Sequence, residues 1–376
     1  MAQVLIIGAG VIGSAIAWEL RRRGAEVAVL ESVSEGGQTS AASAGMVNPF
    51  SLTPEENPAL PFAVESRRQF PEWVARLHEA TGIDAEWQAE GSLRVALTPE
   101  DAEQLQQMAR WVGRYEPEAR LLSPEEARRM EPVLPESCQG ALWLPSEGWI
   151  HTERLMHALH RALRISGVAF HRGQPAIGLV REGRRVRGVQ TPAGTLFADA
   201  VVLCAGAWSG ILLRELGWQV PIEPLRGQIL VLRDLPIRTT RLLVSLGGGA
   251  MGYLVPRASG EALFGATREQ AGYDIRPTAG GVATLLCNLE RMFPSLMDAT
   301  IARVQVGLRP STPDHQPLIG SLPDWEGLYL ASGHSYHGIL LAPATAQAVA
   351  DLLEHGTTQL PIQPFKPERF RTQEVS

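Results

Sequence analysis

The stretch VLIIGAGVIGSAIAWELRRRGAEVAVLE, residues 4–31, decides the fold of this chain. Residues 4–7 form an unbroken apolar run, which is typical of a strand buried on both faces. The pattern G-x-G-x-x-G follows, at Gly8, Gly10 and Gly13. Helix-forming residues then run up to Gly24, a plausible helix C-cap, and a second short apolar segment ends at Glu31.

Each part of this stretch has a physical role in binding a dinucleotide. Gly8 permits the tight turn from strand to helix, Gly10 lets the backbone approach a pyrophosphate, and Gly13 lets the helix lie close to the strand. The free N–H groups at the helix N-terminus then face the phosphates. Glu31 lies eighteen residues beyond Gly13, where a carboxylate accepts hydrogen bonds from an adenosine ribose. The ordered set predicts a dinucleotide site, and the acid argues against NADP.

Composition bounds the class of protein. With 376 residues the chain can bury a large core, in two domains or in one domain with an insertion. A net charge of −6 gives no general attraction to nucleic acid or anionic lipid, so a small-molecule enzyme is the default. The three cysteines are widely spaced, which argues against a disulfide framework and fits a reducing compartment. No apolar run reaches eighteen residues, and the N-terminus lacks the basic region of a signal peptide. We therefore expect a cytoplasmic protein without a transmembrane segment.

Strand and helix patterns return later in the chain. Buried strands followed by helices recur over residues 199–216 and 327–355, which indicates a doubly wound sheet. Residues 221–266 read as extended segments, followed by a helix over 278–293 and a strand over 302–309. The sequence predicts an α/β fold with α+β insertions, in which a Rossmann-like dinucleotide-binding domain carries an antiparallel-sheet substrate domain. The first domain is expected to comprise residues 1–81, 141–218 and 306–376, and the second residues 82–140 and 219–305.

A loop rich in small residues follows the ribose position. This loop, GQTSAASAGMVNPF at residues 37–50, lets backbone and hydroxyl groups come close to a ligand. Thr39 or Ser40 is expected to cap a following helix whose N-terminus adds donors for phosphate. The alternative is a flexible serine/alanine linker. The position directly after the strand that ends at Glu31 favours a cofactor-lining loop.

Other segments carry expectations of their own. His157 and His160 lie three apart on a predicted helix without an acidic or cysteine partner, so we expect a solvated face and no metal site. A helix over residues 60–80 is expected to bend or restart near Pro71. The run Gly247–Gly249 predicts a hairpin turn. The tail after Pro361 reads as a polar surface segment.

Five separated motifs resemble, in the same order, those of the D-amino-acid oxidase family of FAD-dependent oxidoreductases, most closely the glycine oxidases of thiamine biosynthesis. They are GAGVIG at Gly8, TSAASAGMV at Thr39, PLRGQ at Pro224, GYLVPR at Gly252 with GAT at Gly265, and GLRPSTPDHQPLIG at Gly307 with GHSYHGILLAPAT at Gly333. The resemblance covers nearly the whole chain. It implies that the dinucleotide is non-covalently bound FAD.

The resemblance also implies which residues contact the cofactor. In the N-terminal segments these are Gly8, Gly10, Val11, Ile12, Gly13, Glu31, Thr39, Ser40, Ala42, Ala44, Gly45 and Met46. Further along the chain they are Ala176, Gly206, Gly333, His334, Gly338, Ile339 and Leu340. The helix that begins near Gly338 would direct its positive dipole end at the flavin.

On the substrate side, the resemblance implies that Arg309 pairs with the substrate carboxylate and that Tyr253 hydrogen-bonds to it. A guanidinium is permanently charged and matches a carboxylate with two parallel hydrogen bonds. From the residues alone, the alternatives are an ordinary surface ion pair for Arg309 and core packing for Tyr253. The implied reaction transfers a hydride from the carbon bearing the amine to the flavin. The resulting imine hydrolyses to a 2-oxo acid and ammonia, and dioxygen reoxidises the flavin with release of hydrogen peroxide.

Three residues depart from the pattern of the glycine-oxidase branch. Tyr336, in GHSYHG, stands where that branch usually has an arginine. Arg268 stands where a methionine lines the pocket, and Met251 stands where that branch can have histidine. Together with Met46 they form the expected substrate pocket. The departures leave the substrate open among glycine, sarcosine, proline and larger or more apolar D-amino acids.

Three rival functions remain from the sequence. One is a flavin dehydrogenase that passes electrons from a D-amino acid, sarcosine or proline to a carrier other than dioxygen. Another is an NAD-dependent dehydrogenase, which only the N-terminal fingerprint favours. The third is a non-catalytic flavin-binding protein, which would not need Arg309 and Tyr253. The resemblance also allows a homo-oligomer.

Overall fold

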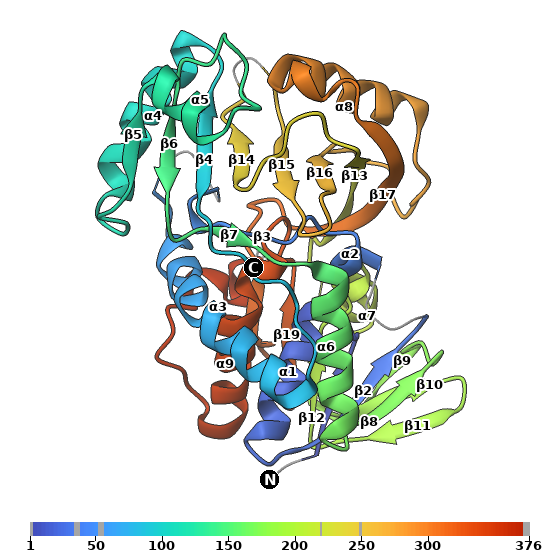
Figure 1. The fold of residues 1–376 in the computed structure, drawn as a ribbon. Coiled ribbons are helices and arrows are strands. Elements are labelled where there is room, and N and C mark those ends of the chain that lie inside the picture. Colours follow the sequence, from blue (N-terminus) through green and yellow to red (C-terminus); the bar gives the residue numbers. More distant parts are fainter. Residues whose placement is uncertain (1–2, 34–37, 52–55, 219, 248–249, 371–376) are drawn as a thin grey trace, which may run out of the picture.

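Two large sheets organise the molecule. The computed structural model describes residues 3–33, 38–51, 56–218, 220–247 and 250–370. A six-stranded, mostly parallel sheet forms the lower part in Figure 1, and an eight-stranded, mostly antiparallel sheet forms the upper part. The predicted α/β fold with an antiparallel insertion is therefore confirmed.

The six-stranded sheet has its first strand near the middle. In spatial order the strands are β18 (Leu318–Ser321), β19 (Leu328–Ser332), β12 (Ala200–Leu203), β1 (Gln3–Ile7), β2 (Glu26–Glu31) and β8 (Ala169–Arg172). All neighbouring pairs are parallel except β18 with β19. Because side chains alternate along a strand, Val4 and Ile6 enter one hydrophobic core and Leu5 and Ile7 enter another on the opposite face. The unbroken apolar run thus reflects burial on both faces.

Different elements cover the two faces of this sheet. One core contains residues of the helices α1 (Val11–Arg22), α3 (Leu60–Thr81), α6 (Thr152–Ile165) and α9 (Gly338–His355). The other core contains residues of a small antiparallel sheet and of one helix. These elements are β9 (Gly178–Glu182), β10 (Arg185–Thr191), β11 (Gly194–Phe197) and α7 (Ser209–Arg214). The sheet is thus a buried middle layer.

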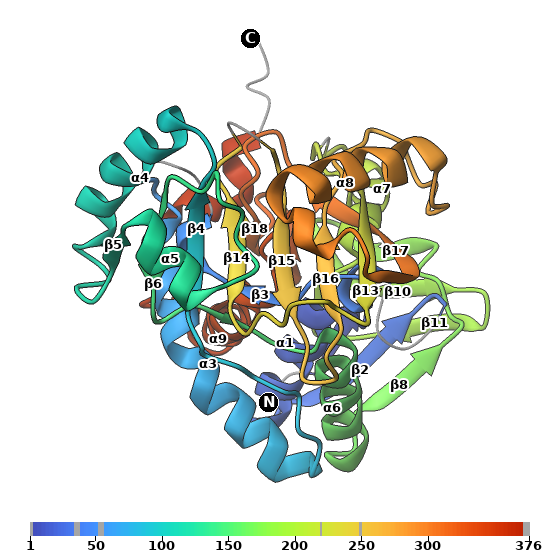
Figure 2. The ribbon, with the colours of Figure 1, turned by 45° about the horizontal axis from the view of Figure 1, so that its top comes forward.

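The eight-stranded sheet draws on distant segments of the chain. Its strands, in spatial order, are β17 (Thr300–Ser311), β13 (Glu223–Arg233), β16 (Ala262–Gly265), β15 (Tyr253–Pro256), β14 (Leu242–Ser245), β4 (Ser92–Ala96), β6 (Gly140–Leu144) and β5 (Arg120–Leu122). Only β14 with β4 is a parallel pair. Figure 2 shows that α8 (Ala279–Met292), α4 (Pro99–Val112) and α5 (Pro124–Met130) lie on its outer side. The division into a cofactor domain and a substrate domain remains our proposal.

Short elements lie where the two sheets meet. These are α2 (Gln38–Ala41) and the two-stranded pair of β3 (Met46–Val47) with β7 (Gly148–Trp149), seen between the two parts in Figure 1. The loop of small residues therefore runs between the parallel sheet and the antiparallel sheet. This position brings residues of both sheets around one space.

Several local expectations are wrong. His160 is only 1% exposed and its Nε2 lies 2.9 Å from the Ala9 carbonyl oxygen, because α6 packs against α1. The tail after Pro361 is partly core, since Phe365 is fully buried with its ring centroid 5.0 Å from that of Phe62. The helix over residues 60–81 runs through Pro71 without a break, so the expected restart there is wrong. In the run Gly247–Gly249, only the first residue lies within the described part of the chain.

The search for membrane spans gives one finding. Among the described residues, no helix combines the length and the apolar character needed to cross a bilayer.

Candidate active site

A cavity lies between the parallel sheet and the antiparallel sheet. One wall, here called the cofactor wall, is formed where the parallel strands end, by Gly8 after β1, Glu31 in β2 and Ser332 in β19. The opposite wall includes Tyr253 of β15 and Arg309 of β17, and we call it the substrate wall after the role that we propose for it below. Ligands of open α/β sheets bind beyond the carboxyl ends of the strands, so this is the expected position for a cofactor.

Most of the predicted site residues line this cavity. They are Gly8, Gly10, Val11, Ile12, Glu31, Thr39, Ser40, Ala42, Ala44, Met46, Ala176, Gly206, Tyr253, Arg309, His334, Tyr336, Gly338 and Ile339. Segments that are hundreds of residues apart in the sequence thus meet around one space. The assignment of a role to each residue remains a prediction.

Six predicted residues lie outside the lining. Gly13 and Gly45 pack against backbone carbonyl oxygens, and Gly333 packs against the Thr312 methyl group, so closely that a Cβ would clash. Leu340 is fully buried in the core. Met251 is 48% exposed, and Arg268 is exposed beside the lining residue Tyr336.

Backbone contacts explain the glycines of the first motif. Gly8 has φ +105°, a conformation that side chains rarely adopt, and a Cβ there would lie 2.5 Å from the Cys204 carbonyl oxygen. A Cβ at Gly13 would collide with the Gly8 carbonyl oxygen. At Gly10 the nearest atom to a Cβ is the Ser40 Oγ, at 3.3 Å. The glycines therefore allow α1 to pack closely against β1 and leave a space at the N-terminus of the helix.

Thr39 and Ser40 do not cap a following helix as expected. Both lie inside the four-residue helix α2. The Ser40 hydroxyl accepts a hydrogen bond from the Val11 N–H at 3.0 Å, and the Thr39 hydroxyl donates to the Leu308 carbonyl at 2.5 Å. The loop thus connects the first turn of α1 to strand β17. It joins the two walls of the cavity.

The polar groups of the cofactor wall suit a dinucleotide. The Glu31 carboxylate is 7% exposed and accepts hydrogen bonds from the Ala9 N–H at 2.9 Å and the Val33 N–H at 3.2 Å. Residues of the first turns of α1 and α9 line the cavity, so the positive dipole ends of both helices lie at it. Neither first turn contains an acidic residue that would offset this positive charge.

Two unpartnered polar atoms also point to a missing ligand. Within the described part of the chain, Gln174 Oε1 and Ser335 Oγ are buried without a hydrogen-bond partner, and both residues line the cavity. Buried polar atoms normally have partners, so these two atoms indicate polar groups of a ligand. Together with the glycine cradle and the two helix ends, they show that the residues present fit FAD.

Arg309 is the positive charge of the cavity. Its Nη1 donates to the Thr267 carbonyl oxygen at 3.0 Å, and its guanidinium carbon lies 5.1 Å from the centroid of the Tyr336 ring. A Cβ at Gly227 would collide with this guanidinium, so the glycine of PLRGQ provides the space for it. Within the described residues, no carboxylate lies within 4.0 Å of Arg309. An anionic ligand would therefore find an uncompensated cation.

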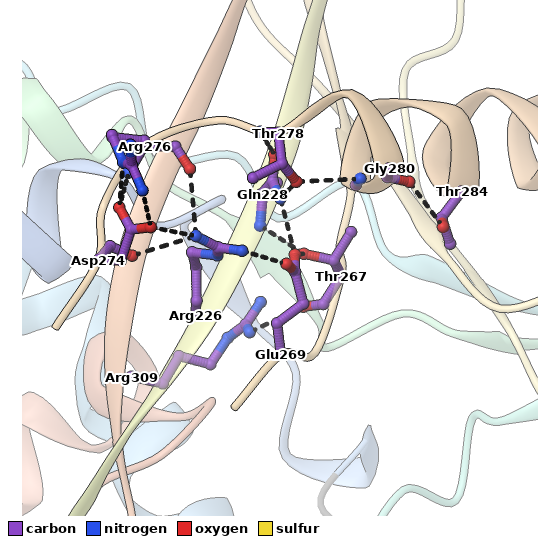
Figure 3. Close-up of polar contacts among 11 residues, drawn as sticks. Arg226, Gln228, Thr267, Glu269, Asp274, Arg276, Thr278, Gly280, Thr284 and Arg309 are labelled. Atoms are coloured by element: carbon purple, nitrogen blue, oxygen red, sulfur yellow. Dashed lines mark hydrogen bonds and ion pairs between the residues drawn. The ribbon is translucent and has the colours of Figure 1, made fainter. Parts of the chain in front are cut away.

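A polar network fixes the carbonyl that holds Arg309 (Figure 3). The Gln228 N–H donates to Thr267 Oγ1 at 2.9 Å, and the Thr267 N–H donates to the Gln228 carbonyl at 3.2 Å. Glu269 accepts from Gln228 Nε2 at 2.7 Å and from Arg226 Nη2 at 2.6 Å. Burial opposes ionisation of Glu269, but hydrogen bonds from Thr267, Arg226 and Gln228 hold the pKa of its carboxyl below the usual value. The Glu269 carboxylate thus pairs with Arg226 and not with Arg309.

Burial keeps two other titratable groups at the cavity, Tyr253 and His334, neutral near pH 7. Burial raises the pKa of Tyr253, although the charges of Arg309, Arg257 and Arg268 oppose this shift. Burial also lowers the pKa of His334 to about 3, with a smaller contribution from His337. These groups are therefore donors or neutral neighbours near pH 7 and not proton acceptors.

Arg257 links the two walls. It follows β15 and is 8% exposed, and its Nη2 donates to the Ala44 carbonyl oxygen at 2.9 Å. Its guanidinium carbon lies 5.2 Å from the centroid of the Trp149 ring. Burial lowers its pKa to about 10. This arginine, which sequence reasoning did not single out, holds the backbone of the cofactor-lining loop.

Sequence reasoning missed other lining residues. They include Ser43, Gln174, Trp208, Gly227, Ile229, Pro310, Ser332 and Ser335. A usable signal existed for some, because Gly227, Pro310 and Ser335 lie inside the quoted motifs. The described residues contain no group of three or more His, Cys, Asp or Glu side chains that could hold a metal ion.

The comparisons with known proteins agree with this site. A family model described as FAD dependent oxidoreductase (DAO) matches residues 3–352. A glycine oxidase of Geobacillus kaustophilus is 34% identical over 97% of this chain and 96% of its own length, and one of Pseudomonas putida is 34% identical over 97% and 98%. The crystal structure of glycine oxidase from Geobacillus kaustophilus superposes with a TM-score of 0.91 at 33% identity, covering 97% of this chain and 98% of that one. The chain therefore belongs to the DAO family of FAD-dependent oxidoreductases.

Proposed function

We propose that this enzyme oxidises the carbon–nitrogen bond of glycine or another small amino acid or amine, with dioxygen as the final electron acceptor. The observation that carries the proposal is Arg309, a cation without a carboxylate partner among the described residues, inside the cavity that also contains the glycine cradle. The glycine oxidases to which the chain is similar support the substrate class.

The residues of the substrate wall would orient the amino acid. Arg309 would bind the substrate carboxylate through two parallel hydrogen bonds, and Tyr253, protonated near pH 7, would donate a third. The Thr267 carbonyl restricts the rotation of the guanidinium, so the carboxylate would be held in one pose. FAD, when bound, supplies the acceptor for the hydride of the α-carbon.

No described side chain at the cavity is poised to take the amine proton. The pKa of His334 is lowered to about 3 and that of Tyr253 is raised, both mainly by burial. The amine would therefore lose its proton to solvent before the hydride moves. Orientation of the substrate and the electrostatic field of the arginines are what the protein contributes.

An anaerobic panel of substrates tests the proposal. Glycine, sarcosine, D-alanine and D-proline are added to the FAD-loaded enzyme, and the flavin absorbance near 450 nm is followed. We expect at least one of them to bleach the flavin, and Arg309→Ala to raise the required concentration about a hundredfold while FAD stays bound. Arg309→Lys, which keeps the charge but loses the fork, should fall between the two.

Two outcomes would overturn parts of the proposal. Unchanged bleaching in Arg309→Ala would show that the carboxylate binds elsewhere. Bleaching without hydrogen peroxide on admission of air would favour a dehydrogenase.

Two further properties are also proposals. We propose a cytoplasmic enzyme that forms a homo-oligomer, as the resemblance to the glycine oxidases implies. Light scattering of the purified, FAD-loaded protein measures the mass in solution. A mass of 40.8 kDa, that of one chain, would contradict the oligomer.

A further inference from the structure

Arg268 is a second cation at the substrate wall. It directly follows Thr267, whose carbonyl oxygen holds Arg309. Its guanidinium carbon lies 5.0 Å from the centroid of the Tyr336 ring, and that of Arg309 lies 5.1 Å from the same centroid. The two distances together limit the separation of the two guanidinium carbons to about 10 Å. Two positive charges thus lie against the ring of one lining residue.

Neither cation has an anionic partner in the described part of the chain. The nearby carboxylates are already used, because Glu269 pairs with Arg226 at 2.6 Å and Asp274 pairs with Arg276 at 2.9 Å. For Arg268 the described structure shows only the contact with the Tyr336 ring. The substrate wall therefore has two uncompensated positive charges, and glycine has one carboxylate.

The charge of Arg268 reaches the cavity. Burial raises the pKa of Tyr253, and Arg268 is one of the arginines whose charge opposes that rise. Burial, with smaller contributions from the charges of His315 and Arg268, lowers the pKa of His337 to about 3. Arg268 is also exposed, so its guanidinium can turn toward a ligand without a large loss of buried contacts.

We propose that Arg268 binds a second anionic group of the substrate, so that the preferred substrates are amines with two carboxylates. The inference rests on the proposed function, in which Arg309 takes the first carboxylate. The amine and the α-hydrogen would lie between the two ends of such a substrate. Iminodiacetate is a secondary amine of this class, and D-aspartate is a primary one.

Binding of unreactive carboxylates to the FAD-loaded enzyme tests the proposal without turnover. Acetate, malonate and succinate are titrated by calorimetry and by the perturbation of flavin absorbance. We expect at least one dicarboxylate to bind ten times more tightly than acetate. Arg268→Gln should weaken dicarboxylate binding at least five times more than acetate binding, and Arg268→Lys should keep part of the preference because it keeps the charge.

A matched control separates contact from long-range charge. Arg291 is an exposed arginine in the last turn of α8, and it does not line the cavity. Arg291→Gln removes the same charge and should leave the ratio of dicarboxylate to acetate affinity unchanged. In turnover, Arg268→Gln should lower kcat/KM for iminodiacetate or D-aspartate relative to glycine by the same factor as in binding.

The possible failures can be told apart. Equal affinities of acetate and dicarboxylates in the wild-type enzyme would overturn the inference about Arg268 alone. A loss in Arg268→Gln that is the same for acetate and dicarboxylates would do so as well, because it would show only a field effect. If no carboxylate binds and Arg309→Ala changes nothing, the proposed function fails at its first step. FAD content and melting temperature establish that each variant is folded.

Discussion

The two walls of the cavity are built in opposite ways. The cofactor wall is defined by missing side chains, since Gly8 and Gly13 let the helix, the strand and a ligand come close together. The substrate wall is defined by side chains that are present, since Arg309, Tyr253 and Tyr336 project from strands or a loop into the space. Where a wall consists of closely packed backbone, a side chain at most of its positions would clash, so few substitutions are tolerated there. A wall made of side chains can change its ligand by one substitution while the fold stays the same.

The largest effect is expected from filling the cofactor wall. Gly13→Ala places a methyl group against the Gly8 carbonyl oxygen, so α1 must move away from β1. Overpacking of this kind costs about 1–3 kcal/mol. We expect a lower melting temperature and a severe loss of bound FAD, measured as the ratio of flavin to protein absorbance.

A glycine of α8, on the outer side of the antiparallel sheet, is the control for this comparison. A Cβ at Gly280 in α8 meets no atom within 4 Å. Gly280→Ala should therefore keep FAD and raise the melting temperature slightly, by the helix preference of about 0.5–1 kcal/mol for alanine. Full FAD retention in Gly13→Ala would break the contrast between the two walls.

A smaller effect on stability is expected when the pH is lowered, and it arises from His334 in the cavity lining and from the nearby His337. Burial lowers the pKa of both His334 and His337 to about 3, whereas an unfolded chain titrates histidine near pH 6.5. Between these pH values only the unfolded state binds the proton. The free energy of unfolding is therefore highest above pH 6.5 and falls as the pH decreases below it. The fall approaches about 1.4 kcal/mol per pH unit for each histidine.

Melting temperatures at pH 7 and pH 5 measure this effect. His337→Gln should lose less stability than the wild-type protein between these two pH values. His355→Gln, which changes an exposed histidine at the end of α9, should lose as much as the wild-type protein. Identical slopes in all three proteins would show that the buried histidines can take up protons in the folded state.

The smallest effect, on the affinity for FAD, is expected from the hydrogen bond by which Arg257 links the two walls. Arg257→Met removes the hydrogen bond from Arg257 to the Ala44 carbonyl but keeps an apolar side chain against Trp149. We expect about a tenfold weaker affinity for FAD, equivalent to about 1.4 kcal/mol. Titration of the apoprotein with FAD measures the affinity. An unchanged affinity would mean that the two walls are independent.

The cofactor wall could be predicted from sequence because its determinants are local. Gly8, Gly10 and Gly13 belong to one turn between one strand and one helix, so their spacing alone specifies the geometry. The bonds of Ser40 and Thr39 could not be predicted, because their partners Val11 and Leu308 come from distant segments. The expected helix cap was the best local alternative, and tertiary contacts replaced it.

The substrate wall could be predicted less well because strand pairing decides it. Gly227 makes room for Arg309 only because β13 pairs with β17 in the observed register, and sequence patterns do not give that register. Met251 was expected in the pocket, but β15 begins at Tyr253, so the alternation of the strand does not extend to it. Its side chain is 48% exposed.

The strand order also has a consequence for synthesis. During translation β1 and β2 emerge well before β12, at residues 200–203, which pairs with the other edge of β1. The last lining residues, Gly338 and Ile339, follow more than a hundred residues later. A nascent chain therefore exposes an apolar strand edge for much of its translation, which favours association with other chains or with chaperones. The lining of the cavity is complete only after residue 339 has been made.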